Sequence, residues 1–252
     1  MDKYLSLYAE PEVQALKDLL KLFEPPEPWS HVIAIPACNE KPDLLRPPPK
    51  CDGRSLMILV INESAGASKQ VSDSNLILAN AVREQFEQQL PSDQTDTDNG
   101  LTLFSDPSNN RNILMVDRFI QGRQLPDGGG VGLARKIGAD LATLLISEKH
   151  IKSNWIHCTD GDVELPDTYL TCIESADLRD NRTTAALIYP FTHIGKDKNI
   201  KSPDLIVQAT QLYELSLRYY VAGMRYAGSP YAFHTIGSTM AASITCDASS
   251  EK

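Results

Sequence analysis

The stretch Trp155-Ile156-His157-Cys158-Thr159-Asp160-Gly161-Asp162 decides how the fold of this chain is interpreted. A short apolar run leads directly into two aspartates that are separated by one glycine. Continuous apolar runs are typical of strands that are buried on both faces, as in a parallel sheet. In an open α/β sheet, ligands bind at the carboxyl ends of the strands. The stretch therefore predicts a buried strand whose two carboxylates lie at the ligand-binding edge of a sheet.

Two explanations fit Asp160-Gly161-Asp162. Aspartate and glycine are the commonest turn residues, so a plain turn at a strand end has the same sequence. Alternatively, the two neighbouring carboxylates repel each other, and a hard divalent cation with oxygen ligands offsets that repulsion. Gly161 would then leave room for a bulky ligand. The second explanation, which we favour, predicts that Asp160 and Asp162 hold Mg²⁺ or Mn²⁺ together with a diphosphate.

Other apolar runs of the same kind predict further strands at residues 31–36, 55–61, 113–116 and 185–189. Helical periodicity separates several of them, and residues 4–23 predict a packing helix. Alternating strands and helices indicate a Rossmann-like, doubly wound α/β fold with a mostly parallel sheet flanked by helices. No linker is apparent, so we expect one domain over residues 1–252, with residues 1–28 as a helical lead-in.

Composition narrows the classes of partner. The 252 residues carry a formal net charge of −9, which argues against nucleic acid because such a partner needs a basic surface. No apolar run approaches the roughly 18 residues of a transmembrane helix, and the first residues lack the apolar core of a secretion signal. The five cysteines are scattered and odd in number, which favours reduced thiols. We therefore expect a cytoplasmic protein with no transmembrane segment.

A glycine-rich segment at residues 128–132 leads into an amphipathic helix. Backbone amides at such a helix start can receive an anion, although a flexible loop before a core helix explains the glycines equally well. The spacing does not match the dinucleotide fingerprint, and the P-loop motif is absent from the sequence. Arg135 and Lys136 follow in the first turns, where we expect them to contact a phosphate or a nucleotide.

Taken in order, residues 32–40, 59–64, 132–138 and 160–162 resemble the motifs of the family 2 glycosyltransferases, which have the GT-A fold of nucleotide-diphosphosugar transferases. The resemblance implies a metal-dependent, inverting glycosyltransferase of hexosyltransferase type. Its implied partners are a nucleotide-diphosphate sugar donor, an unknown acceptor and a Mn²⁺ or Mg²⁺ cofactor. It also implies a nucleotide site formed by Pro36, Ala37, Asn39, Glu40, Asn62 and Arg135, with Asp160 and Asp162 holding sugar and metal through the DxD motif.

The chain departs from the family pattern in three places. Asn62-Glu63 replaces the usual pair of aspartates, so the base and the donor sugar stay open, and Lys136 replaces an asparagine. The family's catalytic base is a carboxylate in a Glu-Asp pair downstream of a second glycine-rich segment; here only Asp247 and Glu251 follow the corresponding Gly237-Ser238. Asp247 is therefore a weak candidate for the base, and Glu214 on the predicted long helix is no better. Either the chain is truncated at its C-terminus or a different carboxylate serves.

Two other functions fit the same fold class. A sugar nucleotidyltransferase would normally show a glycine-rich signature near the first strand, and residues 36–39 do not supply it. A catalytically silent fragment that binds a nucleotide sugar would retain the nucleotide and metal residues without the base. Calorimetry with nucleotides and nucleotide sugars, with and without Mn²⁺, separates these alternatives. Metal-dependent nucleotide binding without turnover would favour the silent fragment.

Overall fold

The computed structural model describes residues 2–23, 25–89, 100–174, 184–193, 203–234 and 239–244. The chain forms two compact units, one of residues 1–187 and 241–252 and the other of residues 188–240. Five α-helices are described: α1 (Asp2–Leu7), α2 (Glu12–Leu22), α3 (Lys69–Gln85), α4 (Val131–Ser147) and α6 (Pro203–Tyr226). Within the described residues, no helix has the length and apolar character that crossing a membrane requires.

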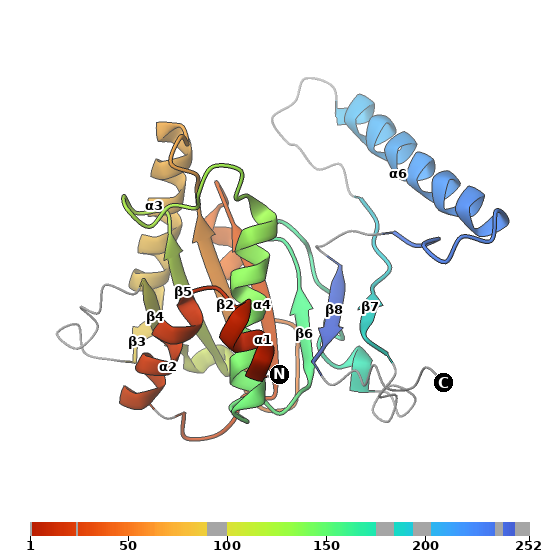
Figure 1. The fold of residues 1–252 in the computed structure, drawn as a ribbon. Helices are drawn as coiled ribbons and strands as arrows, with labels where there is room; N and C mark the ends of the chain where they lie inside the picture. Colours follow the sequence, from red (N-terminus) through yellow and green to blue (C-terminus); the bar gives the residue numbers. More distant parts are fainter. Residues whose placement is uncertain are drawn as a thin grey trace. The chain divides into compact units, whose positions relative to one another are not determined.

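Eight strands form one mixed sheet in the order β3-β4-β5-β2-β1-β6-β8-β7 (Figure 1). Strand β1 pairs in parallel with β2 and β6, and β2 pairs in parallel with β5, whereas β3, β4 and β5 are joined by antiparallel pairs. The prediction of an α/β fold with a sheet flanked by helices is confirmed. The strands are β1 (His31–Ala37), β2 (Ser55–Asn62), β3 (Glu87–Gln88), β4 (Leu101–Asp106), β5 (Arg111–Arg118), β6 (Trp155–Cys158), β7 (Ala186–Ile188) and β8 (Met240–Ser243).

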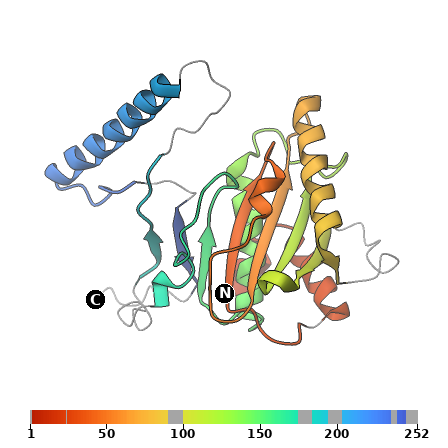
Figure 2. The ribbon, with the colours of Figure 1, turned by 180° about the vertical axis from the view of Figure 1, so that it is seen from behind.

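The core of the first unit lies on both faces of the central strands. All seven residues of β1 and all eight of β2 are buried, as their continuous apolar sequences predict. Helices α4 and α2 cover one face of the sheet and α3 covers the other, as the two opposite views show (Figures 1 and 2). Helix α4 approaches β1 closely at Gly138, where an added Cβ would lie 3.0 Å from the Cβ of Ala34. Gly138 therefore lets α4 pack against the sheet.

The N-terminal lead-in is two helices, so the prediction of a single helix over residues 4–23 is wrong. Pro11 stands at the N-cap of α2, and proline disfavours helical geometry at the residue before it. The buried Asp140 of α4 ties both parts to the domain. Its carboxylate accepts hydrogen bonds from the Tyr4 hydroxyl at 2.7 Å, the Glu10 backbone N–H at 2.9 Å and the Lys136 Nζ at 2.7 Å.

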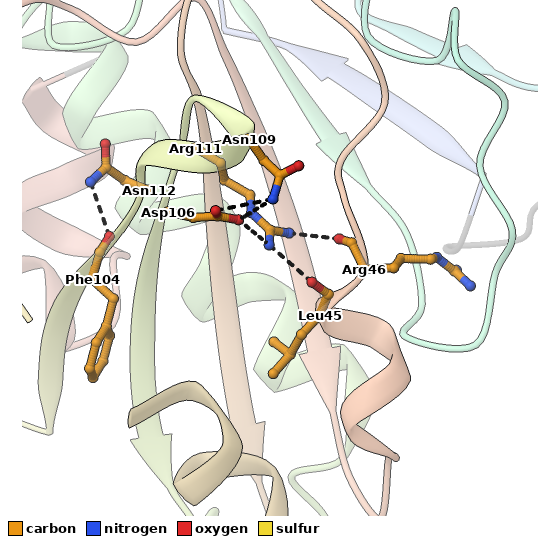
Figure 3. Close-up of polar contacts among 7 residues, drawn as sticks. All are labelled: Leu45, Arg46, Phe104, Asp106, Asn109, Arg111 and Asn112. Atoms are coloured by element: carbon orange, nitrogen blue, oxygen red, sulfur yellow. Dashed lines mark hydrogen bonds and ion pairs between the residues drawn. The ribbon is translucent and has the colours of Figure 1, made fainter. Parts of the chain in front are cut away.

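A buried ion pair joins β4 and β5 to the loop that follows β1 (Figure 3). The Arg111 guanidinium lies 2.7 Å from the Asp106 carboxylate, and their side chains are 1% and 5% exposed. Arg111 also donates hydrogen bonds to the backbone carbonyls of Leu45 and Arg46, both at 3.0 Å. Leu45 ends the short 3-10 helix η1 (Pro42–Leu45), so Arg111 anchors this loop against the sheet.

Replacing Asp106 with alanine would leave the Arg111 guanidinium buried without its counter-ion. We expect Asp106→Ala to lower the free energy of unfolding by about 3–5 kcal/mol, measured by urea denaturation. Asp18→Ala, which removes an exposed partner of Lys21, serves as the control and should leave stability nearly unchanged. Equal effects of the two substitutions would contradict the anchoring role of Arg111.

Candidate functional site

Three loops with predicted site residues leave the sheet at the same edge, because β1, β2 and β6 are parallel neighbours. The loop after β1 carries Asn39 and Glu40, β2 ends at Asn62, and the loop after β6 carries Asp160 and Asp162. Chain segments separated by up to about 120 residues therefore meet at one edge of one sheet. In α/β sheets this carboxyl edge is where ligands bind.

Helix α4 adds a cation to this edge. Arg135, in the second turn of α4, donates a hydrogen bond from its guanidinium to the Asp160 carboxylate at 2.5 Å. The two side chains are 24% and 33% exposed, so the pair is shielded from solvent only in part. The Nε of Arg135 is buried and makes no hydrogen bond to any residue that the structure describes. The structure thus brings together two predicted site residues and leaves one donor of the guanidinium unused.

Glu40 is a third carboxylate beside Asp160-Gly161-Asp162. A Cβ built at Gly161 would lie 3.2 Å from Cγ of Glu40 and 3.3 Å from Cδ2 of Leu44, so a larger residue would require these side chains to shift. Burial raises the pKa of Glu40 above its ordinary value, and the negative charges of Asp162 and Asp160 raise it further. Carboxylates from two separate loops therefore share one negative electrostatic environment.

A divalent cation would need more ligands than this edge supplies. Among the described residues, no three His, Cys, Asp or Glu side chains are grouped so that they could enclose a metal ion. Asp160 is engaged by Arg135, and Asp162 is exposed. The oxygen donors present suit a hard cation, and Mg²⁺ is commonly held by one or two carboxylates together with the phosphates of its substrate.

Asn75 of α3 connects the loops after β1 and β2. Its Oδ1 accepts a hydrogen bond from the backbone N–H of Asn39 at 2.9 Å. Its Nδ2 donates to the carbonyl of Asn62 at 3.1 Å and to the carboxylate of Glu63 at 3.2 Å. Asn75 is 0% exposed, so these bonds replace all of its contact with water. We did not predict this residue, although it lies on the buried stripe of α3 that continues with Leu78, where a polar side chain is unexpected.

The side chain of Asn62 is buried and bonds to the backbone of its own sheet, so it is not open to a ligand. Its side chain is buried, and its Nδ2 donates to the carbonyls of Ala37 and Val60, both at 3.1 Å. Ala37 is itself buried within β1, as is Pro36. Asn39, in contrast, is exposed and has a left-handed backbone with φ of 61°, which asparagine tolerates better than most residues. Of the residues predicted from β1 and β2, only Asn39 and Glu40 reach the surface.

A cavity of about 590 Å³ opens beside Asn39, between the loop after β1 and the start of α3. Lys41 and Lys69 line it, together with Asp73, Ser74, Gln70 and Ile77. The two lysines were not predicted, because single exposed lysines carry no signal in a sequence. A second cavity of about 560 Å³, lined by His31, Lys152 and Trp155 among others, lies at the opposite edge of the sheet, away from the predicted site residues.

Asp247, the candidate for the catalytic base, lies outside the described residues, as do Gly237 and Ser238. The glycine-rich segment before α4 is described: Gly128 has φ of 82°, and Gly130 is the N-cap of the helix. The glycine-rich segment therefore leads directly into α4, as the sequence predicts. The positive φ of Gly128 explains the glycine at this position without an anion contact.

Comparison with known proteins adds no assignment to this geometry. The sequence matches no protein-family model, and a search of curated proteins found no significant match. Function must therefore be argued from the site itself.

The raised pKa of Glu40 predicts a pH-dependent cost of ionisation. Because the folded-state pKa lies above the ordinary value of 4.5, ionising Glu40 destabilises the fold as the pH rises through that folded-state pKa. Glu40→Gln should therefore raise the melting temperature at neutral pH, and the gain should vanish below the ordinary glutamate pKa. Thermal unfolding followed from acidic to neutral pH tests this; a gain that is the same at every pH would contradict it.

Asn75→Leu would remove the acceptor of the Asn39 N–H and the side-chain donor to the carbonyl of the buried Asn62. We expect the free energy of unfolding to fall by about 2–4 kcal/mol in urea denaturation. Asn80→Leu, an exposed position of the same helix, is the matched control and should have little effect. If both substitutions leave stability unchanged, Asn75 does not hold the two loops.

Proposed function

We propose that the chain is a metal-dependent glycosyltransferase of the GT-A fold, which binds a nucleotide-diphosphate sugar at the carboxyl edge of its sheet and transfers the sugar to an acceptor. The observation that carries the proposal is the convergence of Glu40, Asp160 and Arg135, from three different elements, around Gly161. A plain turn after β6 would need none of these contacts.

The charges at this edge support a ligand with phosphate groups held through a cation. Glu40, Asp160 and Asp162 repel one another, and a Mg²⁺ or Mn²⁺ ion would relieve that repulsion. Asp162, which is exposed, is the carboxylate most available to such an ion, and the diphosphate would supply further oxygen ligands. When bound, the metal would act as a Lewis acid that stabilises charge on the departing diphosphate.

The residues of the chain have separate roles in this proposal. The guanidinium of Arg135, whose side chain is 24% exposed, would contact a phosphate or ribose oxygen near Asp160. Lys41 and Lys69 give the adjoining cavity a local positive charge in a chain whose net charge is −9. Asn39, whose backbone N–H is bonded to Asn75 and whose backbone is left-handed, lines this cavity. The nucleotide would thus lie across the ends of β1 and β2, with its diphosphate toward β6.

Sugar transfer with inversion also requires a carboxylate base that deprotonates the acceptor hydroxyl. Asp247 stays the candidate from the sequence.

Incubation with UDP-sugars or GDP-sugars in Mn²⁺, followed by detection of the released nucleotide, separates a transferase from a protein that only binds the donor.

Removing the exposed carboxylate tests the metal assignment. Asp162→Asn should weaken binding of UDP or GDP in Mn²⁺ by about tenfold or more, measured by isothermal titration calorimetry, because the metal loses a charged ligand. In EDTA the variant and the original protein should bind equally. Asp167→Asn is the matched control, since Asp167 follows in the same loop and pairs with Lys50 at the surface. If the double variant Asp160→Ala, Asp162→Ala retains metal-dependent binding, the assignment is wrong.

A further inference from the structure

Helix α6 belongs to the second unit and packs within that unit through one side only. The Glu214 carboxylate on this side accepts a hydrogen bond from the backbone N–H of His193 at 2.9 Å, and Arg218 donates to the carbonyl of Phe191 at 3.3 Å. Val221, farther along the same side, is 6% exposed. Phe191 and His193 therefore lie against the side of α6 that contains Glu214.

The opposite side of α6 carries a line of large apolar residues that are exposed. Their spacing of seven, three, four and seven residues is that of positions a and d in a heptad repeat, in which Gln208 and Ala222 occupy the two other positions. We name this line the α6 seam. Its members are Leu205, Leu212, Leu215, Tyr219 and Tyr226, which are 64%, 66%, 63%, 81% and 97% exposed.

We propose that the α6 seam pairs with the α6 seam of a second copy of this chain, so that the protein is a dimer. A heptad line of apolar residues fits the surface of another helix, because knobs at a and d need holes with the same repeat. Among the described helices, α6 alone exposes such a line; α3, for comparison, exposes only the adjacent Leu76 and Ile77. The partner helix with a matching seam is therefore α6 itself, as an isologous two-fold interface requires.

The area of the seam suits a stable dimer. At these exposures, the five residues offer roughly 700 Å² per copy, so a dimer that covered them completely would bury about 1,400 Å², within the range of specific interfaces. Leucine and tyrosine at the centre, with Arg218 and Arg225 at the margin, also match the composition of protein interfaces.

Charge argues against a membrane as the occupant. A helix that lies on an anionic bilayer carries several lysines and arginines on its polar face. Over residues 205–226, α6 has only Arg218 and Arg225 as cations, and Arg218 is paired with Glu214 at 2.5 Å. The chain as a whole is anionic, with a net charge of −9.

The oligomeric state of the whole chain tests the proposal. Light scattering coupled to gel filtration should give twice the chain mass of 27.8 kDa, with dissociation on dilution. The double variant Leu212→Glu, Leu215→Glu should be monomeric, with a dimer dissociation constant at least about 100-fold higher, while its circular dichroism stays unchanged. Tyr219→Ala, which removes a side chain that is 81% exposed and so little involved in packing its own unit, should weaken the dimer without unfolding the chain.

Tyr220→Glu is the matched control, because Tyr220 is 67% exposed on α6 but lies off the seam, and it should leave the dimer intact. A monomeric wild-type chain at all concentrations overturns the proposal, whether or not it binds lipid vesicles. So does a dimer that neither the double variant nor Tyr219→Ala weakens. If the wild type is monomeric and the double variant unfolds, the seam is covered by the chain's own residues and the proposal is also wrong.

Discussion

Strand β1 is hydrogen-bonded in parallel register to β2 on one side and to β6 on the other, and the positions of the polar loops follow from that double pairing. Parallel strands that start together end together, so Asn39, Asn62 and Asp160 emerge at one edge although the sequence separates them widely. Every residue of β1 is buried, so a shift by one residue would turn its side chains to the wrong faces. The same burial that stabilises the sheet therefore sets the geometry of the candidate site.

The close packing of α4 against β1 determines where Arg135 lies at the candidate site. A Cβ added at Gly138 would lie only 3.0 Å from the Cβ of Ala34, so a larger residue there would push the helix or Ala34 aside. Arg135, one turn earlier in α4, is thereby brought to Asp160 at the end of β6. The position of a charged side chain at the site thus depends on two small residues in the core, which have no chemistry of their own.

The parts of this structure that could be predicted are those in which one segment carries its own signal. The continuous apolar runs of β1, β2, β5 and β6 required burial on both faces, and the structure has them as strands. Strand β4 was missed because its apolar residues are interrupted by Thr102 and Ser105, which are half-buried. The roles of Asn75 and Arg111 could not be predicted, because their partners lie on other segments and are defined only after the chain folds.

The balance of charge bears on the proposed function, in which this edge would bind a cation and a diphosphate together rather than either alone. Arg135 neutralises Asp160, and the remaining carboxylates of Glu40 and Asp162 would repel a phosphate that approached without a cation. A cation alone would lack ligands, since the described side chains cannot enclose it. Each ligand supplies what the other needs, so their binding free energies should be coupled through this edge. In the proposed function, a chain with an overall negative charge would in this way select a negatively charged ligand by requiring that it arrive with its metal.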